Sequence, residues 1–178
     1  MFFESFSSMD VFVYSSGYIT VDKSQFRCAL GRTGIKENKK EGDGATPAGK
    51  FPFRSVLFRS DRLSIPHTML PTSSIQPEDG WCDEPYDPNY NKPVCIPYDA
   101  SYEALWREDC LYDIIVVLGH NDEPVTPFGG SAIFLHCAKK NYSPTKGCVA
   151  LSKRNLVSLL KLIGPEDNLI VSAEDSLS

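Results

Sequence analysis

The sequence predicts a mainly β protein with one or two helices. Short segments near the N-terminus alternate apolar and polar residues between Gly and Ser, two later apolar runs have the length of buried strands, and one segment has clear helical periodicity. The chain of 178 residues fits one domain, residues 1–178, with a core large enough to fold unaided.

Three alternating segments open the chain: Val11–Tyr14, Tyr18–Val21 and residues 26–30. Gly and Ser separate them, so we expect the strands of a meander. Residues 31–49 are polar and rich in Gly, and an apolar stretch at 51–53 follows. Such a segment indicates a long hairpin loop or flap between strands.

The middle of the chain has little periodicity. Residues 60–97 are rich in Pro, Asp, Tyr and Asn, and loops of this length are uncommon unless they form a binding surface or a lid. Residues 101–107 then indicate a short helix, with Ser101 as its N-cap and Glu103 near its positive end.

The C-terminal third returns to regular patterns. Ile114–Leu118 and residues 132–135 are apolar and predict buried strands. Residues 152–163 have the spacing of an amphipathic helix, with apolar positions at Leu156, Leu159, Leu160 and Ile163. Residues 169–171 predict a last strand.

The charge balance argues against nucleic-acid binding. The formal net charge is −5, whereas such binding depends on clustered Lys and Arg. The basic clusters at 36–40 and 139–140 are typical of solvated loops.

No stretch approaches the roughly 20 apolar residues that span a bilayer. The N-terminus has no Lys or Arg before its hydrophobic residues and does not resemble a signal peptide. We therefore expect a cytoplasmic protein if the chain is full length, or a periplasmic or cell-wall protein if an export signal was removed.

Neither a metal nor another cofactor is expected. The six cysteines include no Cys-x-x-Cys pair, so no zinc ribbon or thioredoxin-type site is indicated, and mostly reduced thiols are expected. Asp83, Glu84 and Asp87 lie among prolines without regular ligand spacing. A solvated loop explains them better than a cation site.

The densest group of chemically capable residues lies between 131 and 151. His136 follows an apolar strand, and Cys148 comes directly after Gly147. A thiol acting near neutral pH needs a partner that favours the thiolate, usually an imidazole. His136 and Cys148 could face each other across the intervening loop. Gly147 permits close approach and positive φ, which exposes backbone N–H groups that could stabilise an oxyanion.

Two alternatives remain open from this spacing. A buried cysteine is more often inert than catalytic, and local signatures do not transfer between families. His120 also follows an apolar strand and is a second candidate for the base.

Several motifs together resemble one known family. His136 followed by residues 145–149, Thr-Lys-Gly-Cys-Val, resembles the catalytic motif of the L,D-transpeptidase catalytic-domain (YkuD-like) family. Residues 46–51 match the family's Thr-Pro-x-Gly-x-Phe hairpin. The chain is similar to a branch that also carries the segments 40–44, 80–83, 90–91, 121–122 and 130–136, and the resemblance runs from residue 10 to 172.

The resemblance implies a β-sandwich or barrel-like catalytic domain that acts on peptidoglycan stem peptides. Carried over, Cys148 is the nucleophile, His136 is the base and then the acid, and the Gly147–Cys148 backbone is part of the oxyanion hole. The family attacks the bond between a diamino acid and the terminal D-alanine of a tetrapeptide and forms a thioester. An amine of a second stem then gives a 3→3 crosslink, whereas water gives a tripeptide. The family's reaction needs no metal, and carbapenem sensitivity is implied.

The sequence departs from the family pattern at two positions. Arg is common two residues after the nucleophile, where this chain has Ala150, so the substrate must be anchored elsewhere. Candidates for substrate binding are Lys40, Trp81, Arg107, Thr145 and Lys146. Cys137 follows the catalytic His where Gly or Ser is common. If the backbone carbonyl at 137 orients the imidazole, the side chain there is unimportant.

Three functions follow as hypotheses. The first is L,D-transpeptidase, the second is an L,D-carboxypeptidase of cell-wall recycling, and the third is a non-catalytic wall-binding module. The expected partners are bacterial peptidoglycan stem peptides or muropeptides, without an obligate protein partner. A live site predicts a depressed pKa for Cys148 and fast reaction with iodoacetamide or a carbapenem.

Overall fold

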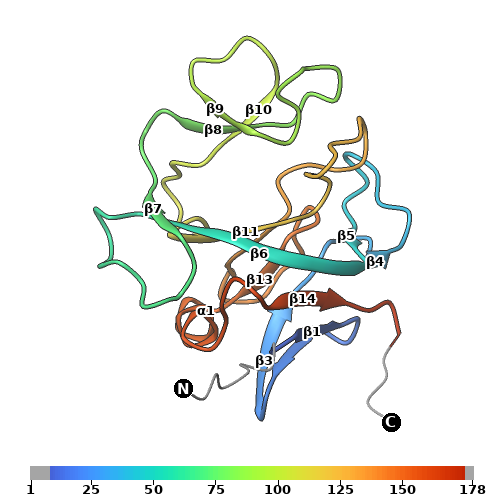
Figure 1. Cartoon of the computed structure of the whole chain (residues 1–178), viewed down its shortest axis with the longest axis vertical. Helices are drawn as coiled ribbons and strands as arrows, with labels where there is room; N and C mark the ends of the chain where they lie inside the picture. Colours follow the sequence, from blue (N-terminus) through green and yellow to red (C-terminus); the bar gives the residue numbers. More distant parts are fainter. Residues whose placement is uncertain (1–8, 175–178) are drawn as a thin grey trace, which may run out of the picture.

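The computed structural model describes residues 9–174 and is built around one strongly curved sheet. Its strands are β1 (Val11–Tyr14), β2 (Tyr18–Val21), β3 (Ser24–Ala29), β6 (Gly49–Phe58), β7 (Thr72–Ser74), β11 (Ile114–Leu118), β12 (Phe134–Cys137), β13 (Val149–Leu151) and β14 (Asn168–Val171). They follow the order β11-β12-β13-β3-β2-β1-β14-β6-β7. Because β11 also pairs with β6, the sheet closes on itself in a barrel-like shape (Figure 1).

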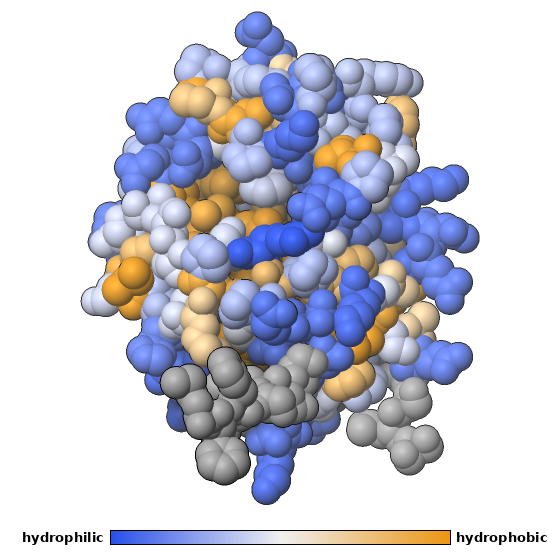
Figure 2. Space-filling view, in the orientation of Figure 1, coloured by the Kyte–Doolittle hydropathy of each residue, from blue (hydrophilic) through white to orange (hydrophobic). Residues whose placement is uncertain are grey.

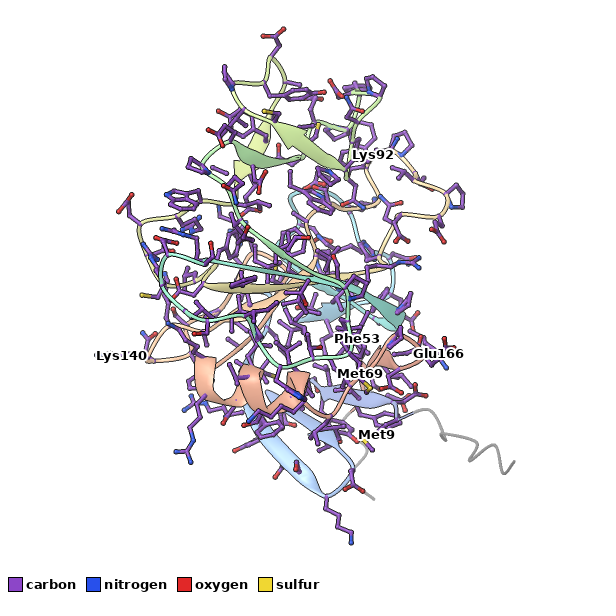
Figure 3. All side chains as sticks on the ribbon, turned by 60° about the vertical axis from the view of Figure 1, so that its left-hand side comes forward. Met9, Phe53, Met69, Lys92, Lys140 and Glu166 are labelled. Atoms are coloured by element: carbon purple, nitrogen blue, oxygen red, sulfur yellow. The ribbon has the colours of Figure 1, made fainter. Side chains whose placement is uncertain are left out.

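A second, smaller sheet caps one end of the barrel. It contains β8 (Asp79–Cys82), β9 (Pro93–Cys95) and β10 (Tyr102–Ala104), with β8 in the middle. This small sheet lies at the end of the molecule away from helix α1 (Lys153–Leu160), and Lys92 marks its position in Figure 3. Two short parallel strands, β4 (Ile35–Lys36) and β5 (Thr46–Pro47), pair beside the barrel.

Most predicted strands are confirmed. The structure gives β1, β2 and β11 the bounds that the sequence predicts, and it shifts the ends of β3, β12 and β14 by one or two residues. The segment 31–49 is largely loop, as expected, with β4 and β5 near its two ends. The aperiodic segment 60–97 contains β7, β8 and β9, which are too short to produce a clear alternation.

The helix predicted at residues 101–107 is wrong. Tyr102–Ala104 instead form β10, in which Glu103 lies opposite Trp81 of β8. A helix of two turns is marginal in water because few of its backbone groups find partners. Pairing with β8 provides these partners, so tertiary contact overrides the local Ser101 capping pattern.

The helix predicted at 152–163 is confirmed, with its regular part ending at Leu160. The Ser152 side chain caps its N-terminus by accepting a hydrogen bond from the Asn155 N–H at 3.2 Å. The apolar face covers one opening of the barrel with the buried side chains of Leu156, Leu159, Leu160 and Ile163.

Two hydrophobic clusters explain why every residue of β11 is buried. Ile114, Val116 and Leu118 belong to the barrel interior, to which Phe53 also contributes (Figure 3). The alternate residues, Ile115 and Val117, pack in a second cluster with aromatic side chains beneath the small sheet. Successive side chains of a strand point to opposite faces, so each strand here divides its residues between the two clusters.

The same alternation positions the residues of chemical interest. On β12, Leu135 and Cys137 point into the barrel, so Phe134 and His136 face the small sheet. Val149 of β13 points into the barrel, and Cys148, which directly precedes this strand, faces the small sheet. The period of two therefore brings the two predicted catalytic side chains to one face.

Among residues 9–174, no helix is long and apolar enough to cross a membrane. The face in Figure 2 is mostly hydrophilic, with hydrophobic areas distributed among polar ones. Among the described residues, the large apolar side chains with the highest exposure lie in loops: Ile65 and Met69 between β6 and β7, and Tyr86 and Phe128, whose rings contact each other.

Candidate active site

A cavity of about 790 Å³ lies between the small sheet and the barrel. Its walls come from β10, from the loop between β3 and β5, from the chain that enters β12 and from the segment that precedes β13. Both His136 and Cys148 line it. The two residues that the sequence singles out therefore share one cavity.

Cys148 is almost fully buried, with 9% of its surface exposed. Its thiol donates a hydrogen bond to the Ala132 carbonyl at 3.1 Å, and Sγ accepts one from the Phe134 N–H at 3.4 Å. Burial and the negative charge of Glu103 raise the pKa of Cys148 to about 12. The structure does not give Cys148 the depressed pKa that is predicted for an active site, because the thiol lies in an apolar cluster that disfavours its charged form.

His136 is buried on β12 beside Ala150 of β13. Its Nδ1 lies 3.0 Å from the carbonyl oxygen of Cys137. Since a carbonyl can only accept, Nδ1 carries the proton and Nε2 keeps a lone pair. This geometry supports the hypothesis that the backbone carbonyl at 137 orients the imidazole. Burial lowers the pKa of His136 to about 4, so the ring is a neutral base near pH 7.

The loop before the nucleophile depends on Thr145 and Gly147. Gly147 has φ of 145°, and a Cβ there would lie 2.8 Å from the Ala45 carbonyl oxygen. The predicted need for glycine is thus confirmed. The Thr145 hydroxyl accepts from the Gly147 N–H at 3.1 Å and donates to the Cys148 carbonyl at 2.6 Å. The Gly147 N–H is therefore engaged inside the loop.

Asn91, whose role the sequence does not reveal, holds the backbone beside the thiol. Its Oδ1 accepts from the Ala132 N–H at 3.0 Å and from the Trp81 indole at 2.9 Å. Its Nδ2 donates to the carbonyls of residues 120 and 121. Ala132, at φ of 51°, presents its own carbonyl to the thiol. Asn91 therefore connects the small sheet to the nucleophile's immediate support.

A second polar group supports the same segment from the loop between β4 and β5. The Tyr90 hydroxyl donates to the Glu41 carboxylate, and the Ser131 hydroxyl donates to Glu41 Oε2 at 2.7 Å. The Tyr90 oxygen in turn accepts from the Gly130 N–H at 3.0 Å. Both Glu41 and Ser131 line the cavity, so this group forms part of its wall.

Tyr112 and Glu103 are further residues that the sequence did not assign to the site. The Tyr112 hydroxyl donates to Glu103 Oε1 at 2.5 Å, and the Tyr112 ring packs edge-on against His136 with centroids 5.3 Å apart. Both side chains line the cavity. The sequence pattern placed Glu103 on a helix, which concealed its position opposite the nucleophile.

The structure brings only some of the expected substrate-binding residues to the cavity. Arg107, Thr145 and Lys146 line it, whereas Lys40 and Trp81 do not. Lys40 is exposed, and Trp81 is 8% exposed, packed edge-on against Phe134. Basic residues that the sequence missed also line the cavity: Arg32, Lys39 and Lys139.

His120, the alternative base, lies elsewhere. Its Nε2 is 3.0 Å from the Gly129 carbonyl, and its ring packs edge-on against Phe51 with centroids 5.4 Å apart. It does not line the cavity that contains Cys148. His136 is therefore the imidazole that shares the site with the thiol.

Among the described residues, no group of three or more His, Cys, Asp or Glu side chains is placed to hold a metal ion. The Asp87 carboxylate accepts hydrogen bonds from the Tyr98 hydroxyl and the Asn89 N–H, both at 2.7 Å. All six cysteines are free thiols. The chemistry available here is that of thiol, imidazole, carboxylate and backbone amides.

Comparisons with known proteins identify one family. A family model described as the L,D-transpeptidase catalytic domain (YkuD) matches residues 11–171. Two similar solved structures are L,D-transpeptidase 1 of Mycobacterium tuberculosis, at 13% identity and TM-score 0.42, and an L,D-transpeptidase of Mycobacterium smegmatis, at 15% and 0.42. The matches cover 92% and 93% of this chain but only 61% and 59% of those chains, respectively. No curated protein matched the sequence.

Proposed function

The chain belongs to the L,D-transpeptidase catalytic domain family, and we propose that it transfers acyl groups of peptidoglycan stem peptides through a thioester on Cys148. One observation carries the proposal. The imidazole of His136 on β12 and the thiol of Cys148, the residue directly before β13, line one cavity. The buried thiol, neutral base and shaped cavity meet the requirements of nucleophilic acyl transfer.

Acylation begins with the substrate carbonyl placed next to Sγ. His136 Nε2 takes the thiol proton as sulfur attacks the carbonyl carbon, so that no free thiolate accumulates beforehand. The carbonyl oxygen then carries negative charge, and we assign the Cys148 N–H as a donor to it because the Gly147 N–H is engaged by Thr145. When the C–N bond breaks, the imidazolium returns the proton to the departing amine of D-alanine.

Deacylation decides between two products. Attack by an amine of a second stem gives a 3→3 crosslink, and attack by water gives a tripeptide. In both cases, His136 takes a proton from the attacking group and gives it to sulfur as the C–S bond breaks. The acceptor that reaches the thioester therefore determines whether the protein is a transpeptidase or a carboxypeptidase.

The experiment uses the purified chain of residues 1–178 and disaccharide-tetrapeptide muropeptides. We expect free D-alanine, a covalent adduct on Cys148 by intact mass and peptide mapping, and 3→3 crosslinked dimers by mass spectrometry. Cys148→Ala should abolish all three while the circular dichroism spectrum is retained. Dimers formed equally by Cys148→Ala would disprove the assignment of the nucleophile, and an unaltered substrate with no adduct would disprove the proposed reaction.

A second candidate, L,D-carboxypeptidase activity, rests on Ala150. This residue lines the cavity directly beside His136, and its methyl group supplies no cation at a position where the family pattern has Arg. Tripeptide and D-alanine without dimers would support hydrolysis. In that case the place of action would be cytoplasmic recycling of wall fragments, whereas crosslinking would place it in the periplasm or cell wall.

A carbapenem provides an independent probe of the same nucleophile. We expect one equivalent to acylate Cys148, because the strained lactam carbonyl needs only the thiol and its base. Wild type that binds muropeptides without any adduct from either reagent would instead support a non-catalytic wall-binding module.

A further inference from the structure

We propose that Tyr112 is a positioning residue for His136: its ring holds the imidazole so that Nδ1 keeps its bond to the Cys137 carbonyl and Nε2 stays free to take a proton. The inference rests on the proposed function and deepens it, because it adds a residue that acts through the proposed base. Three observations carry it: the packing of the two rings, the side chains that fix Tyr112, and the place of Tyr112 in the cavity wall.

The rings of Tyr112 and His136 meet edge-on, with centroids 5.3 Å apart and an interplanar angle of 77°. Both side chains are buried. The hydrogen bond from Nδ1 to the Cys137 carbonyl, at 3.0 Å, holds one edge of the imidazole. The terminal torsion of a histidine is broad, so one hydrogen bond leaves the ring free to tilt. The Tyr112 ring restricts this tilt from the segment that precedes β11.

Tyr112 is itself fixed at its far end and over its face. Its hydroxyl donates to Glu103 Oε1 of β10 at 2.5 Å. The Arg107 guanidinium carbon lies 5.2 Å from the centroid of the ring, within the range of a cation–π contact. Arg107 is held in turn by Asp109 at 2.6 Å. Since the backbone fixes one end of the phenol and Glu103 the other, the ring is a rigid support for the imidazole.

The support lies in the wall of the site. Tyr112, His136 and Cys148 line the same cavity. Burial is the largest cause of the low pKa of His136, whereas the charges of Arg107 and Asp109 act on that pKa in opposite directions. The Tyr112 ring contributes to this burial because it covers one side of the imidazole. Loss of the ring therefore lets the imidazole tilt and admits water to it, and the pKa of His136 should rise towards its ordinary value of about 6.5.

The first test needs no substrate. The chain has three histidines, so NMR of labelled imidazoles gives three titration curves, and the spectrum of His136→Ala identifies the one that belongs to His136. Tyr112→Leu should raise the midpoint of this curve by about one pH unit or more. Tyr112→Phe keeps the ring and should stay closer to the wild type than Tyr112→Leu. An unchanged midpoint in Tyr112→Leu would overturn the inference.

A matched control separates positioning from general packing. Ile75 is fully buried in the same hydrophobic cluster as Tyr112 but does not line the cavity. Ile75→Val should therefore leave the His136 midpoint at its wild-type value, and an equal rise in this variant would contradict a specific role for Tyr112. If circular dichroism shows that Tyr112→Leu has lost its fold, Tyr112→Met replaces it, and the same rise is expected because a flexible chain gives no rigid edge.

The second test compares two reactions of Cys148 by mass mapping. Acylation by a carbapenem near neutral pH uses the base, so Tyr112→Leu should slow it about tenfold. Alkylation by iodoacetamide at about pH 10 relies on hydroxide to remove the thiol proton, so its rate should change less than about twofold. Equal slowing of both reactions would show that Tyr112 only shapes the cavity around the thiol.

The two tests also separate this inference from the function on which it rests. A wild type that forms no carbapenem adduct and no adduct with muropeptides would refute the proposed function. The titration midpoints of His136 in the Tyr112 variants would still decide whether Tyr112 positions the imidazole.

Discussion

At the scale of single residues, Cys148 and His136, the proposed nucleophile and base, rest in their neutral forms. Burial raises the pKa of Cys148 to about 12 and lowers that of His136 to about 4. Both shifts oppose a preformed thiolate–imidazolium pair. Proton transfer must therefore accompany attack on the substrate, which resembles the logic of a Ser–His pair more than that of a preionised cysteine.

This resting state predicts the pH dependence of Cys148 alkylation. A thiol with a raised pKa becomes more reactive as pH rises, so the iodoacetamide rate should increase continuously from about pH 6 to about pH 10 without a plateau near neutrality. Mass mapping of the Cys148 peptide gives the rate. Alkylation of the exposed Cys95 and Cys110 in the same sample serves as an internal control for the activity of the reagent. A plateau that begins below about pH 7 would show that the free enzyme holds a thiolate.

Gly147 offers a second test at this scale. Gly147→Ala would place Cβ 2.8 Å from the Ala45 carbonyl oxygen in a backbone conformation that side chains rarely adopt. We expect a loss of about 2 kcal/mol in unfolding free energy and a larger loss of acylation, because the loop carries the nucleophile. Urea unfolding and carbapenem adduct formation measure the two effects.

Gly34→Ala is the matched control for Gly147→Ala. Gly34 also has positive φ, 81°, but nothing lies within 4 Å of a Cβ there. It therefore carries the backbone strain without the collision. Equal destabilisation by the two substitutions would contradict the steric argument for Gly147.

At the scale of elements, alternation predicts strands whose two faces differ, and a continuous apolar run predicts a strand that is covered on both faces. Val11–Tyr14 and Ile114–Leu118 are recovered with their observed bounds. The same period of two places His136 and Cys148 on one face, so the core of the site could be predicted from residue type, glycine and spacing. These signals reflect the burial of each strand's own residues and do not depend on how near its partner lies, since β1 pairs with β14 at the other end of the chain.

The parts that could not be predicted depend on tertiary contacts that leave no pattern in the local sequence. β10 pairs with β8, about 20 residues earlier, against the local helix pattern. Asn91 reaches Ala132, and Glu103 meets Tyr112 only after the small sheet folds over the barrel. No local pattern distinguishes these side chains from solvated ones, so Glu103 was assigned to a helix end instead of the cavity.

Asp113 connects the start of β11 to helix α1 through an ion pair, and this connection can be tested. It precedes β11, is 1% exposed along its side chain, and accepts from Arg62 at 2.9 Å and from Lys153 at the start of α1. Burial acts to raise its pKa, but Lys153 and Arg62 outweigh burial and hold that pKa below its usual value. The ion pairs therefore stabilise the fold above the unfolded-state pKa of about 4, and this contribution is lost as pH falls through the folded-state pKa.

Asp113→Asn should lower the unfolding free energy by about 2 kcal/mol near neutral pH, because it leaves the two cations without their buried partner. The loss should shrink below about pH 4, where wild-type Asp113 also becomes protonated. Urea unfolding at several pH values measures it. Asp99→Asn, at an exposed position, should change little. A deficit that is constant with pH would contradict the linkage.

At the scale of the whole molecule, the active site lies between two units with different support. The barrel is closed by the pairing of β11 with β6 and is covered by α1, whereas the small sheet contains three short strands. Between them lie the cavity and the second hydrophobic cluster. The small sheet supplies Glu103, and the barrel supplies the thiol and the imidazole, so the complete site requires the two units to stay docked.

Asn91 is the polar link between these units, and its removal tests the dependence. Asn91→Ala leaves the Trp81 indole and the Ala132 N–H without their shared acceptor. Hydrogen exchange should therefore become faster in β8, β9 and β10 while β1, β2 and β11 keep their protection, because short strands open locally when buried hydrogen bonds are lost. Carbapenem acylation should slow in parallel, since Ala132 also supports the thiol.

Asn89→Ala, an exposed neighbour, is the control for Asn91→Ala and should leave both the exchange rates and the acylation rate near wild type. Uniformly faster exchange across the barrel strands would show that the two units unfold together, and unchanged acylation despite an open small sheet would show that the nucleophile does not depend on this link.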